Sequence, residues 1–61
     1  MKDLRNTRDR LLTEADDCEL IAKLAGDLKK RAFFAKLAVQ MRAMARDVDA
    51  QIKAQLKHDV D

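Results

Sequence analysis

The chain has 61 residues, of which 48% are apolar and 39% charged, and its 13 basic and 11 acidic side chains give a net charge of +2. This length allows one small domain, residues 1–61, and the apolar content is too high for a disordered chain. Trp and Tyr are absent, which removes the stacking groups on which single-strand nucleic-acid binders rely. The charged N-terminus leads into no long apolar run, which predicts a cytoplasmic location without a signal peptide or membrane span.

The first predicted helix runs over about residues 3–25. Apolar or small residues recur on one face of it at helical spacing, and they are Leu4, Thr7, Leu11, Ala15, Cys18, Ile21, Ala22 and Ala25. Small side chains on this face allow a neighbouring helix to approach closely. Leu20 and Leu24, four residues apart, form a second apolar ridge that one partner helix cannot cover. This ridge is a first indication of a second subunit.

Gly26 and Asp27 predict a corner after the first helix. Gly26 is the only glycine and the chain has no proline. A glycine just past a helix end adopts the left-handed conformation without steric cost, and Asp27 can accept hydrogen bonds from the first free N–H groups of a second helix. The alternative is one continuous helix in a long coiled coil, with Gly26 inside it at about 1 kcal/mol relative to Ala. The apolar face shifts across Gly26, which favours the hairpin.

The second predicted helix runs over about residues 28–57, followed by a frayed tail at 58–61. Its apolar stripe follows helical spacing over more than six turns and comprises Phe34, Leu37, Ala38, Met41, Met44, Ala45, Val48, Ile52 and Leu56, with Phe33 widening its start. A hairpin turning at 26–27 pairs residues whose numbers sum to about 53, so the first helix runs out opposite position 51. Ile52 and Leu56 then have no intramolecular partner, which indicates that another chain covers them.

Charges follow a pattern that suits this antiparallel arrangement. The acidic block at residues 14–19 is expected near Lys36, and Arg5 is expected near Asp47 and Asp49. Exposed ion pairs contribute only ~0–1 kcal/mol each, so they select the register more than they stabilise it.

Residues 11–52 resemble a group of short bacterial proteins. The matching positions are Ala15, Cys18, Ile21, Ala22, Asp27, Arg31, Phe34, Leu37, Ala38, Met41, Met44 and Ala45. They fit a pattern A-x-x-C-x-x-L-A…D-x-x-x-R-x-x-F-x-x-L-A-x-x-W-x-x-L-A, with Met41 at the usual Trp and Gly26-Asp27-Leu28 where Asp-Pro is common. The resemblance implies two helices joined at the Asp and carries no activity.

Catalytic and metal sites find little support in the sequence. Cys18 lies on the core stripe between two acidic neighbours, which favours a buried structural thiol over a reactive one, with an intersubunit disulfide left open. Glu14 alone of the acidic block borders the apolar face, and there is no Glu-x-x-His motif for a bundle metal site. Cys18 and His58 lie far apart in a hairpin, and the chain has no Ser. We therefore expect no enzyme activity, no cofactor and no metal.

The sequence predicts an all-α, two-helix antiparallel hairpin that dimerises into a four-helix bundle and acts in protein–protein interaction. The expected intramolecular seam contains Leu11, Cys18, Ile21, Phe34, Leu37, Met41 and Val48. The expected oligomer interface contains Leu20, Leu24, Phe33, Met44, Ile52 and Leu56. The partner is a second copy in the simplest case, and an unidentified protein in another. The alternative function is a nucleic-acid-associated accessory protein whose phosphate-contacting residues are Lys29, Lys30, Arg31, Lys36, Arg42 and Arg46.

Overall fold

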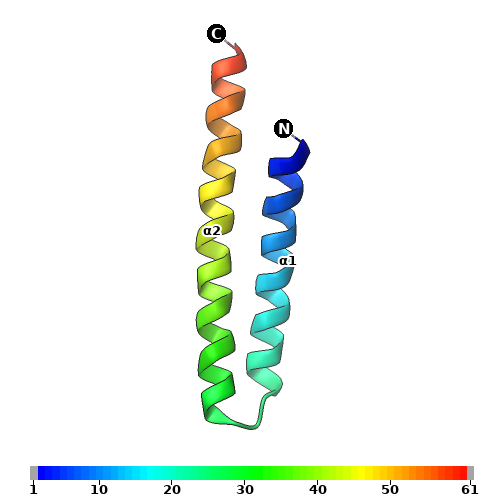
Figure 1. The fold of residues 1–61 in the computed structure, drawn as a ribbon, viewed down its shortest axis with the longest axis vertical. Helices are drawn as coiled ribbons and strands as arrows, with labels where there is room; N and C mark the ends of the chain where they lie inside the picture. The colour runs from blue at the N-terminus through cyan, green and yellow to red at the C-terminus, as the bar shows by residue number, and fades with distance from the viewer. Residues whose placement is uncertain (1, 61) are drawn as a thin grey trace.

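The computed structural model describes the backbone of residues 2–60 and the side chains of residues 3–56. Helix α1 spans Lys2–Leu24 and helix α2 spans Leu28–Val60. The helices lie side by side and antiparallel, with the turn at one end of the molecule and α2 extending past the start of α1 at the other (Figure 1). The resulting rod measures 52 × 15 × 11 Å. The predicted all-α helical hairpin is confirmed.

The helix boundaries lie close to the predicted ones. Helix α1 begins and ends one residue earlier than expected, and α2 begins at the expected residue. The backbone of α2 stays helical to Val60, three residues past the expected end. That residues 58–61 fray stays a prediction, and Asp61 lies outside the described residues.

The turn is organised by Asp27 rather than by Gly26. The Asp27 side chain caps α2, because its Oδ1 accepts the Lys29 N–H at 2.9 Å, as predicted. The Arg31 N–H donates to the Asp27 carbonyl at 3.0 Å, and the Ala25 N–H donates to the Ile21 carbonyl at 2.9 Å. The predicted left-handed conformation of Gly26 is wrong, since its φ is not positive. A three-residue connection is long enough to reverse the chain without a left-handed residue.

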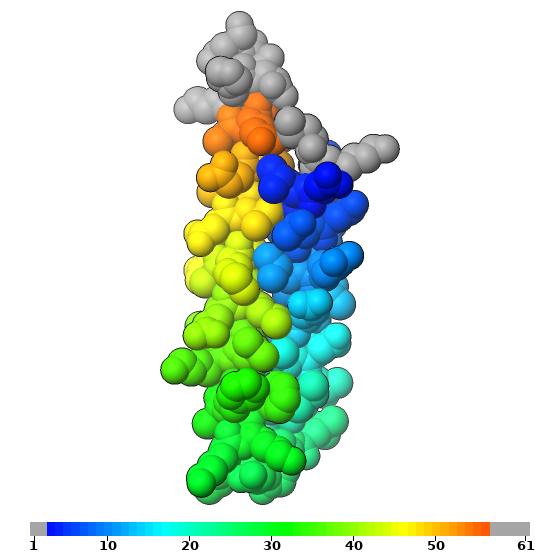
Figure 2. Space-filling view, in the orientation of Figure 1, coloured from blue at the N-terminus to red at the C-terminus, as the bar shows by residue number. Residues whose placement is uncertain are grey.

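The seam between the helices is built mainly from small side chains. Its buried residues are Ala15, Cys18 and Ala22 on α1 and Ala38, Ala45 and Ile52 on α2. Alanine at the contact allows two helix axes to approach closely, and the space-filling view shows the helices in contact along α1 (Figure 2). The predicted burial of Cys18 is confirmed, at 7% exposed with a free thiol. Larger seam residues are only half-buried: Leu11, Phe34, Leu37, Met41 and Val48.

Two residues differ from the prediction in their burial. Ile21, expected in the seam, is 44% exposed, because the small residues around it bring α2 toward Cys18 and Ala22 instead. Ile52, expected to extend beyond α1 and reach only another chain, is 6% exposed within the single chain. The prediction that Ile52 has no partner within its own chain is therefore wrong.

The direction of the side chains explains the burial of Ile52. Side chains on a helix lean toward its N-terminus, so Ile52 leans back toward the first turns of α1. The same lean lets Arg8 reach Asp49, where the prediction placed Arg5, one helical turn earlier. Arg42 likewise reaches the acidic block, where the prediction placed Lys36. Since α1 has 23 residues and α2 has 33 and both start from the same turn, about ten residues of α2, from about residue 51 onward, form its overhang.

Candidate oligomerisation surface

The seam divides the surface of the hairpin into two sides. On the first, which we call the ion-paired side, charged groups of the two helices contact each other. Its charged residues include Arg8, Asp16, Glu19 and Lys23 on α1 and Arg42, Arg46, Asp49 and Lys53 on α2. On each helix these positions follow helical spacing along one edge of the seam.

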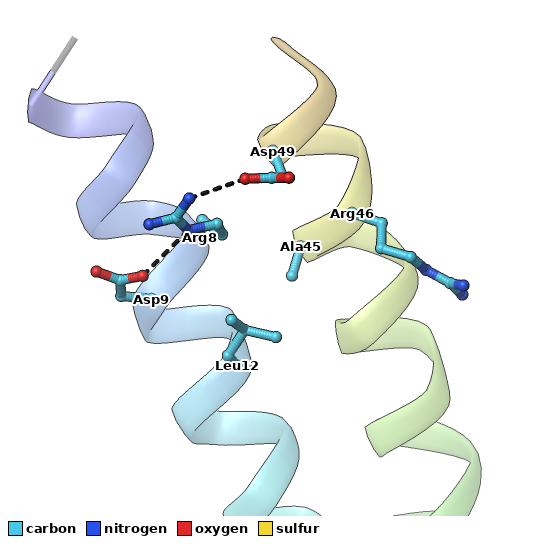
Figure 3. A pocket seen from close by; sticks show the side chains of 6 residues that line it. All are labelled: Arg8, Asp9, Leu12, Ala45, Arg46 and Asp49. Carbon is cyan, nitrogen blue, oxygen red and sulfur yellow. Dashed lines mark hydrogen bonds and ion pairs between the residues drawn. The ribbon is translucent and has the colours of Figure 1, made fainter. Parts of the chain in front are cut away.

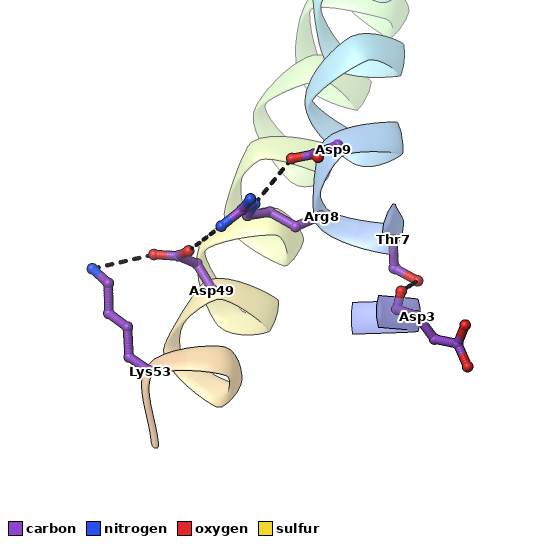
Figure 4. Close-up of polar contacts among 6 residues, drawn as sticks. All are labelled: Asp3, Thr7, Arg8, Asp9, Asp49 and Lys53. Atoms are coloured by element: carbon purple, nitrogen blue, oxygen red, sulfur yellow. Dashed lines mark hydrogen bonds and ion pairs between the residues drawn. The ribbon is translucent and has the colours of Figure 1, made fainter. Parts of the chain in front are cut away.

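A first cluster on the ion-paired side joins the start of α1 to the later part of α2. The Arg8 Nη1 donates to Asp49 Oδ1 at 2.8 Å, and Lys53 Nζ lies 3.2 Å from the other oxygen of the same carboxylate (Figure 4). The Arg8 Nε also donates to Asp9 at 3.1 Å. Within α1, the Thr7 hydroxyl donates to the Asp3 carbonyl. Asp49 is thus held by cations from both helices.

A second cluster lies closer to the turn. The Arg42 Nη2 donates to Asp16 at 3.0 Å and also to Glu19. Lys23 Nζ lies 3.6 Å from the other Glu19 oxygen. The predicted pairing of the acidic block with the basic part of α2 is therefore present, with Arg42 as the partner.

These contacts shift the pKa values of the groups that make them. The hydrogen bond from Arg8, and after it that from Lys53, lowers the pKa of Asp49 below its ordinary value of 3.8. The hydrogen bond from Arg42 lowers the pKa of Glu19 below its ordinary value of 4.5. The same two contacts raise the pKa values of Arg8 and Arg42. All four residues are therefore charged together at neutral pH.

A shallow groove of about 350 Å³ accompanies the first cluster. It is lined by Arg8, Asp9, Leu12, Ala45, Arg46 and Asp49 (Figure 3). Leu12, 42% exposed, forms part of its floor beside Ala45. The groove is open, and Arg8, Asp9 and Asp49 are already engaged with one another, so it offers little to a small ligand.

The opposite side of α2 carries no charge over six turns. Its residues follow helical spacing and are Phe33, Leu37, Gln40, Met44, Val48, Gln51 and Gln55, which we call the uncharged stripe. Phe33 is 61% exposed and Met44 46% exposed. A seven-residue stripe without a charged group is unusual in a chain with 39% charged residues. An uncharged, partly exposed helix face is typical of a surface that contacts another protein.

Phe33 is held at the end of this stripe by its neighbour. The Phe33 and Phe34 rings meet edge to face, with centroids 5.2 Å apart and planes at 85°, a geometry favoured by the ring quadrupoles. Phe34 is half-buried in the seam. The seam therefore fixes the orientation of an exposed aromatic ring, as at the rigid anchors of protein interfaces.

Helix α1 contributes a mixed surface to this same side. The seam residues of α1 separate two flanks, one of which carries Arg8 and Glu19. On the other flank, helical spacing places Asp3, Arg10, Glu14, Asp17 and Ile21. All but Ile21 are charged. The side opposite the ion pairs thus consists of an uncharged half on α2 and a charged half on α1.

A second shallow groove, of about 390 Å³, lies at the turn. We call it the turn groove, and it is lined by Ile21, Leu24, Ala25, Gly26, Asp27 and Lys30. Leu24 is 76% exposed. The turn groove lies at the end of the molecule opposite the overhang of α2 (Figure 1).

The predicted interface residues fall in five places. Phe33 and Met44 lie on the uncharged stripe. Leu20, 55% exposed, lies on the outer face of α1, and Leu24 lies at the turn groove. Leu56, 48% exposed, lies on the overhang, while the side chain of Ile52 is buried in the seam.

Sequence reasoning missed part of the exposed apolar surface. Ile21 was assigned to the seam, and Leu12, Leu28 and Val39 to no surface, although these three are 42%, 76% and 62% exposed. The alternation of charged and uncharged flanks along α2 was readable in the sequence, because it follows the same helical period as the core.

The predicted phosphate-contacting residues do not share one face. They are Lys29, Lys30, Arg31, Lys36, Arg42 and Arg46. Helical spacing places Arg31 on the ion-paired side, Lys30 beside the uncharged stripe and Lys36 on the back of α2. Arg42 is engaged by Asp16 and Glu19. The basic residues therefore form no continuous stripe for a phosphate backbone.

Within residues 2–60, neither helix has a stretch long and apolar enough to cross a membrane. Among the side chains that the structure describes, no three His, Cys, Asp or Glu residues gather in a way that could hold a metal ion. The His58 side chain lies outside this part. Comparisons with protein-family models, with curated proteins and with solved structures found no match for the chain.

Proposed function

We propose that the chain is a non-catalytic assembly module that works as a homodimer, in which two hairpins pack into a four-helix bundle. The single observation that carries this proposal is the set of large apolar side chains that the hairpin leaves exposed. Nine such residues are at least 42% exposed, and no large side chain among the described residues is fully buried. A second copy of the same surface is the simplest group that covers those on one side of the hairpin.

The surface area of the chain supports the same proposal. A folded monomer of 7.0 kDa exposes about 4,000 Å² by the general scaling of surface with mass, whereas the hairpin exposes 5018 Å². The excess is about 1,000 Å², and a standard protein interface buries about 800 Å² on each partner. One hairpin therefore has roughly one interface more exposed surface than a finished small domain.

The uncharged stripe is the part of the surface best suited to this contact. Phe33 and Met44 are exposed apolar groups on it, and its glutamines can be covered without the cost of desolvating a charge. Leu12 and Val39 are exposed on the ion-paired side as well, but a partner that covered them would also have to desolvate the charged groups beside them. A reducing compartment such as the cytoplasm suits the unpaired Cys18 thiol.

Sedimentation equilibrium of the full chain, with reducing agent and over a concentration series, tests the proposal. We expect a mass of twice 7.0 kDa that persists at high salt, because an apolar contact is not screened. A helical monomer at all concentrations would contradict the proposal and leave the uncharged stripe for an unrelated protein. A disordered monomer would contradict it as well, since the hairpin would then need a different partner to fold.

A further inference from the structure

The uncharged stripe limits which surface of a second copy can cover it. If α2 of one copy packs on α1 of the other, Leu37 and Met44 meet the half that carries Arg10, Glu14 and Asp17. Burying such charges against apolar side chains is costly. The uncharged stripe of the second α2 offers apolar groups and glutamines alone. Charge therefore favours contact between the two α2 helices.

We infer that the two hairpins pack antiparallel, with their turns at opposite ends, so that the overhang of each copy lies over the turn groove of the other. This inference rests on the proposed homodimer and adds its orientation. A face-to-face dimer that places α2 on α2 has its two-fold axis perpendicular to the helices, and this axis reverses the direction of the second hairpin. The same axis places α1 on α1, where Arg10 of one copy can approach Glu14 of the other.

The apolar members of the uncharged stripe set the register. They are Phe33, Leu37, Met44 and Val48, and they are symmetric about the midpoint between residues 40 and 41. A two-fold axis at this midpoint places Phe33 of one copy against Val48 of the other, and Leu37 against Met44. Each apolar residue then meets an apolar residue.

This register gives the overhang a place to bind. Extending it along α2 aligns residue 56 of one copy with residue 25 of the other. The overhang therefore lies beside the turn groove, where Leu24 is 76% exposed. Leu56 has no helix beside its outer half within its own chain and is 48% exposed. In this arrangement the overhang of each copy covers the turn groove of the other, so the contact occurs once at each end of the dimer.

The opposite orientation leaves both ends uncovered. With the two turns at the same end, the overhangs extend together past the bundle and the turn grooves stay open. The uncharged stripe also meets the charged half of α1 in that orientation. The antiparallel dimer packs the uncharged stripe against its uncharged copy and also covers each turn groove with an overhang.

Site-specific cross-linking tests the orientation. Two single-cysteine variants, Leu24→Cys and Leu56→Cys, are made in a Cys18→Ala background and treated with a short bis-maleimide linker. Within one chain these positions lie at opposite ends of a 52 Å rod, so a link between them joins two copies. We expect covalent dimer when the variants are mixed, and little when either is treated alone. Peptide mapping identifies the linked residues, and Gln55→Cys replaces Leu56→Cys if that variant loses helicity.

Three outcomes would overturn the inference, and they are distinguishable. Efficient linking of either variant with itself would show turns at the same end. A dimer by sedimentation that links in none of the three samples would show that the overhang does not occupy the turn groove, while the homodimer stands. A monomer by sedimentation of the unmodified chain would remove the homodimer itself, and the inference with it.

Discussion

The two sides of the hairpin differ in what they do with their side chains. On the ion-paired side, Arg8 and Arg42 connect the helices through Asp49, Asp16 and Glu19. On the other side, the uncharged stripe of α2 leaves Phe33 and Met44 exposed. The ion pairs of the first side are therefore complete in a single hairpin, whereas these two apolar groups are left uncovered.

The two sides make different contributions: one selects the helix register and the other contributes free energy of stabilisation. Exposed ion pairs add little free energy but discriminate between registers, because a slip of one turn separates the partners. Apolar surface contributes most of the free energy, at about 25 cal/mol per Å² buried, but it tolerates slips. The ion-paired side thus sets how the two helices align, and we assign stabilisation by a second copy to the uncharged stripe.

The largest expected effect comes from a charge placed on the uncharged stripe. Met44→Asp removes an apolar side chain worth about 1.5–3 kcal/mol when buried and adds a carboxylate at the proposed dimer contact. Since the dimer contains two such sites, we expect association to weaken at least 100-fold. Sedimentation should then report monomer, and circular dichroism a lower helicity at micromolar concentration.

Val39→Asp is the matched control for this substitution. Val39 is an exposed apolar residue of the same helix, at 62% exposed, but it lies on the ion-paired flank. We expect its mass and helicity to match those of the unmodified chain. Equal loss of association in both variants would show that the two sides of α2 do not differ.

A charge on the overhang should act in the same direction with a smaller effect. Leu56→Asp removes a side chain that is already half covered within its own chain, at 48% exposed. We expect association to weaken on the order of tenfold to 100-fold, as measured by sedimentation. An unchanged dissociation constant would indicate that no second copy covers the overhang.

The turn should respond to its aspartate more than to its glycine. Asp27→Ala removes the cap of α2 and should lower the free energy of unfolding by about 0.5–2 kcal/mol. Gly26→Ala should raise it by about 0.4–1 kcal/mol, because φ is not positive and nothing lies within 4 Å of an added Cβ. Urea unfolding of the two variants measures both. A destabilising Gly26→Ala would mean that the turn needs a conformation reserved for glycine.

The ion-paired side should be the more tolerant of substitution. Arg42→Ala removes the contacts to Asp16 and Glu19, and we expect a small decrease in the thermal midpoint that shrinks at high salt. Arg46→Ala is the control, because Arg46 makes no ion pair among the described residues, and its midpoint should not change. Loss of the dimer in Arg42→Ala would show that the ion pairs also support association.

The pH dependence should report the same clusters. The pKa values of Asp49 and Glu19 are lowered by their partners, so these carboxylates contribute stability that is fully present above their ordinary values of 3.8 and 4.5 and is lost as the pH falls through the lowered values. Thermal melts across acidic pH should show this loss. A variant that combines Arg8→Ala with Arg42→Ala should show a shallower loss. An equal slope would assign the acid sensitivity to other groups.

The hairpin was readable from the sequence because its signals are local. The helical period of the apolar residues, the single break at Gly26 and the cap at Asp27 each depend on neighbours within a few positions. Cys18 and its small neighbours likewise predicted a closely packed seam, and the structure buries them.

The partners of the long side chains were not readable, because they depend on the reach and direction of each side chain and not only on the level of its Cα atom. Arg8 and Arg42 bind carboxylates that the prediction gave to Arg5 and Lys36. Ile52 is buried although it lies near the level where α1 begins. Ile21 was assigned to the seam on helical spacing alone, whereas the small residues beside it make the contact.

The contact between two copies through the uncharged stripe is tested most directly by isotope-filtered NMR on a mixture of labelled and unlabelled chains. The account predicts intermolecular NOEs between the Met44 methyl group of one copy and the Leu37 methyl groups of the other. The same experiment should show none at Val39. The absence of intermolecular NOEs at Met44 in a sample that sediments as a dimer would contradict the account, because the copies would then meet through another surface.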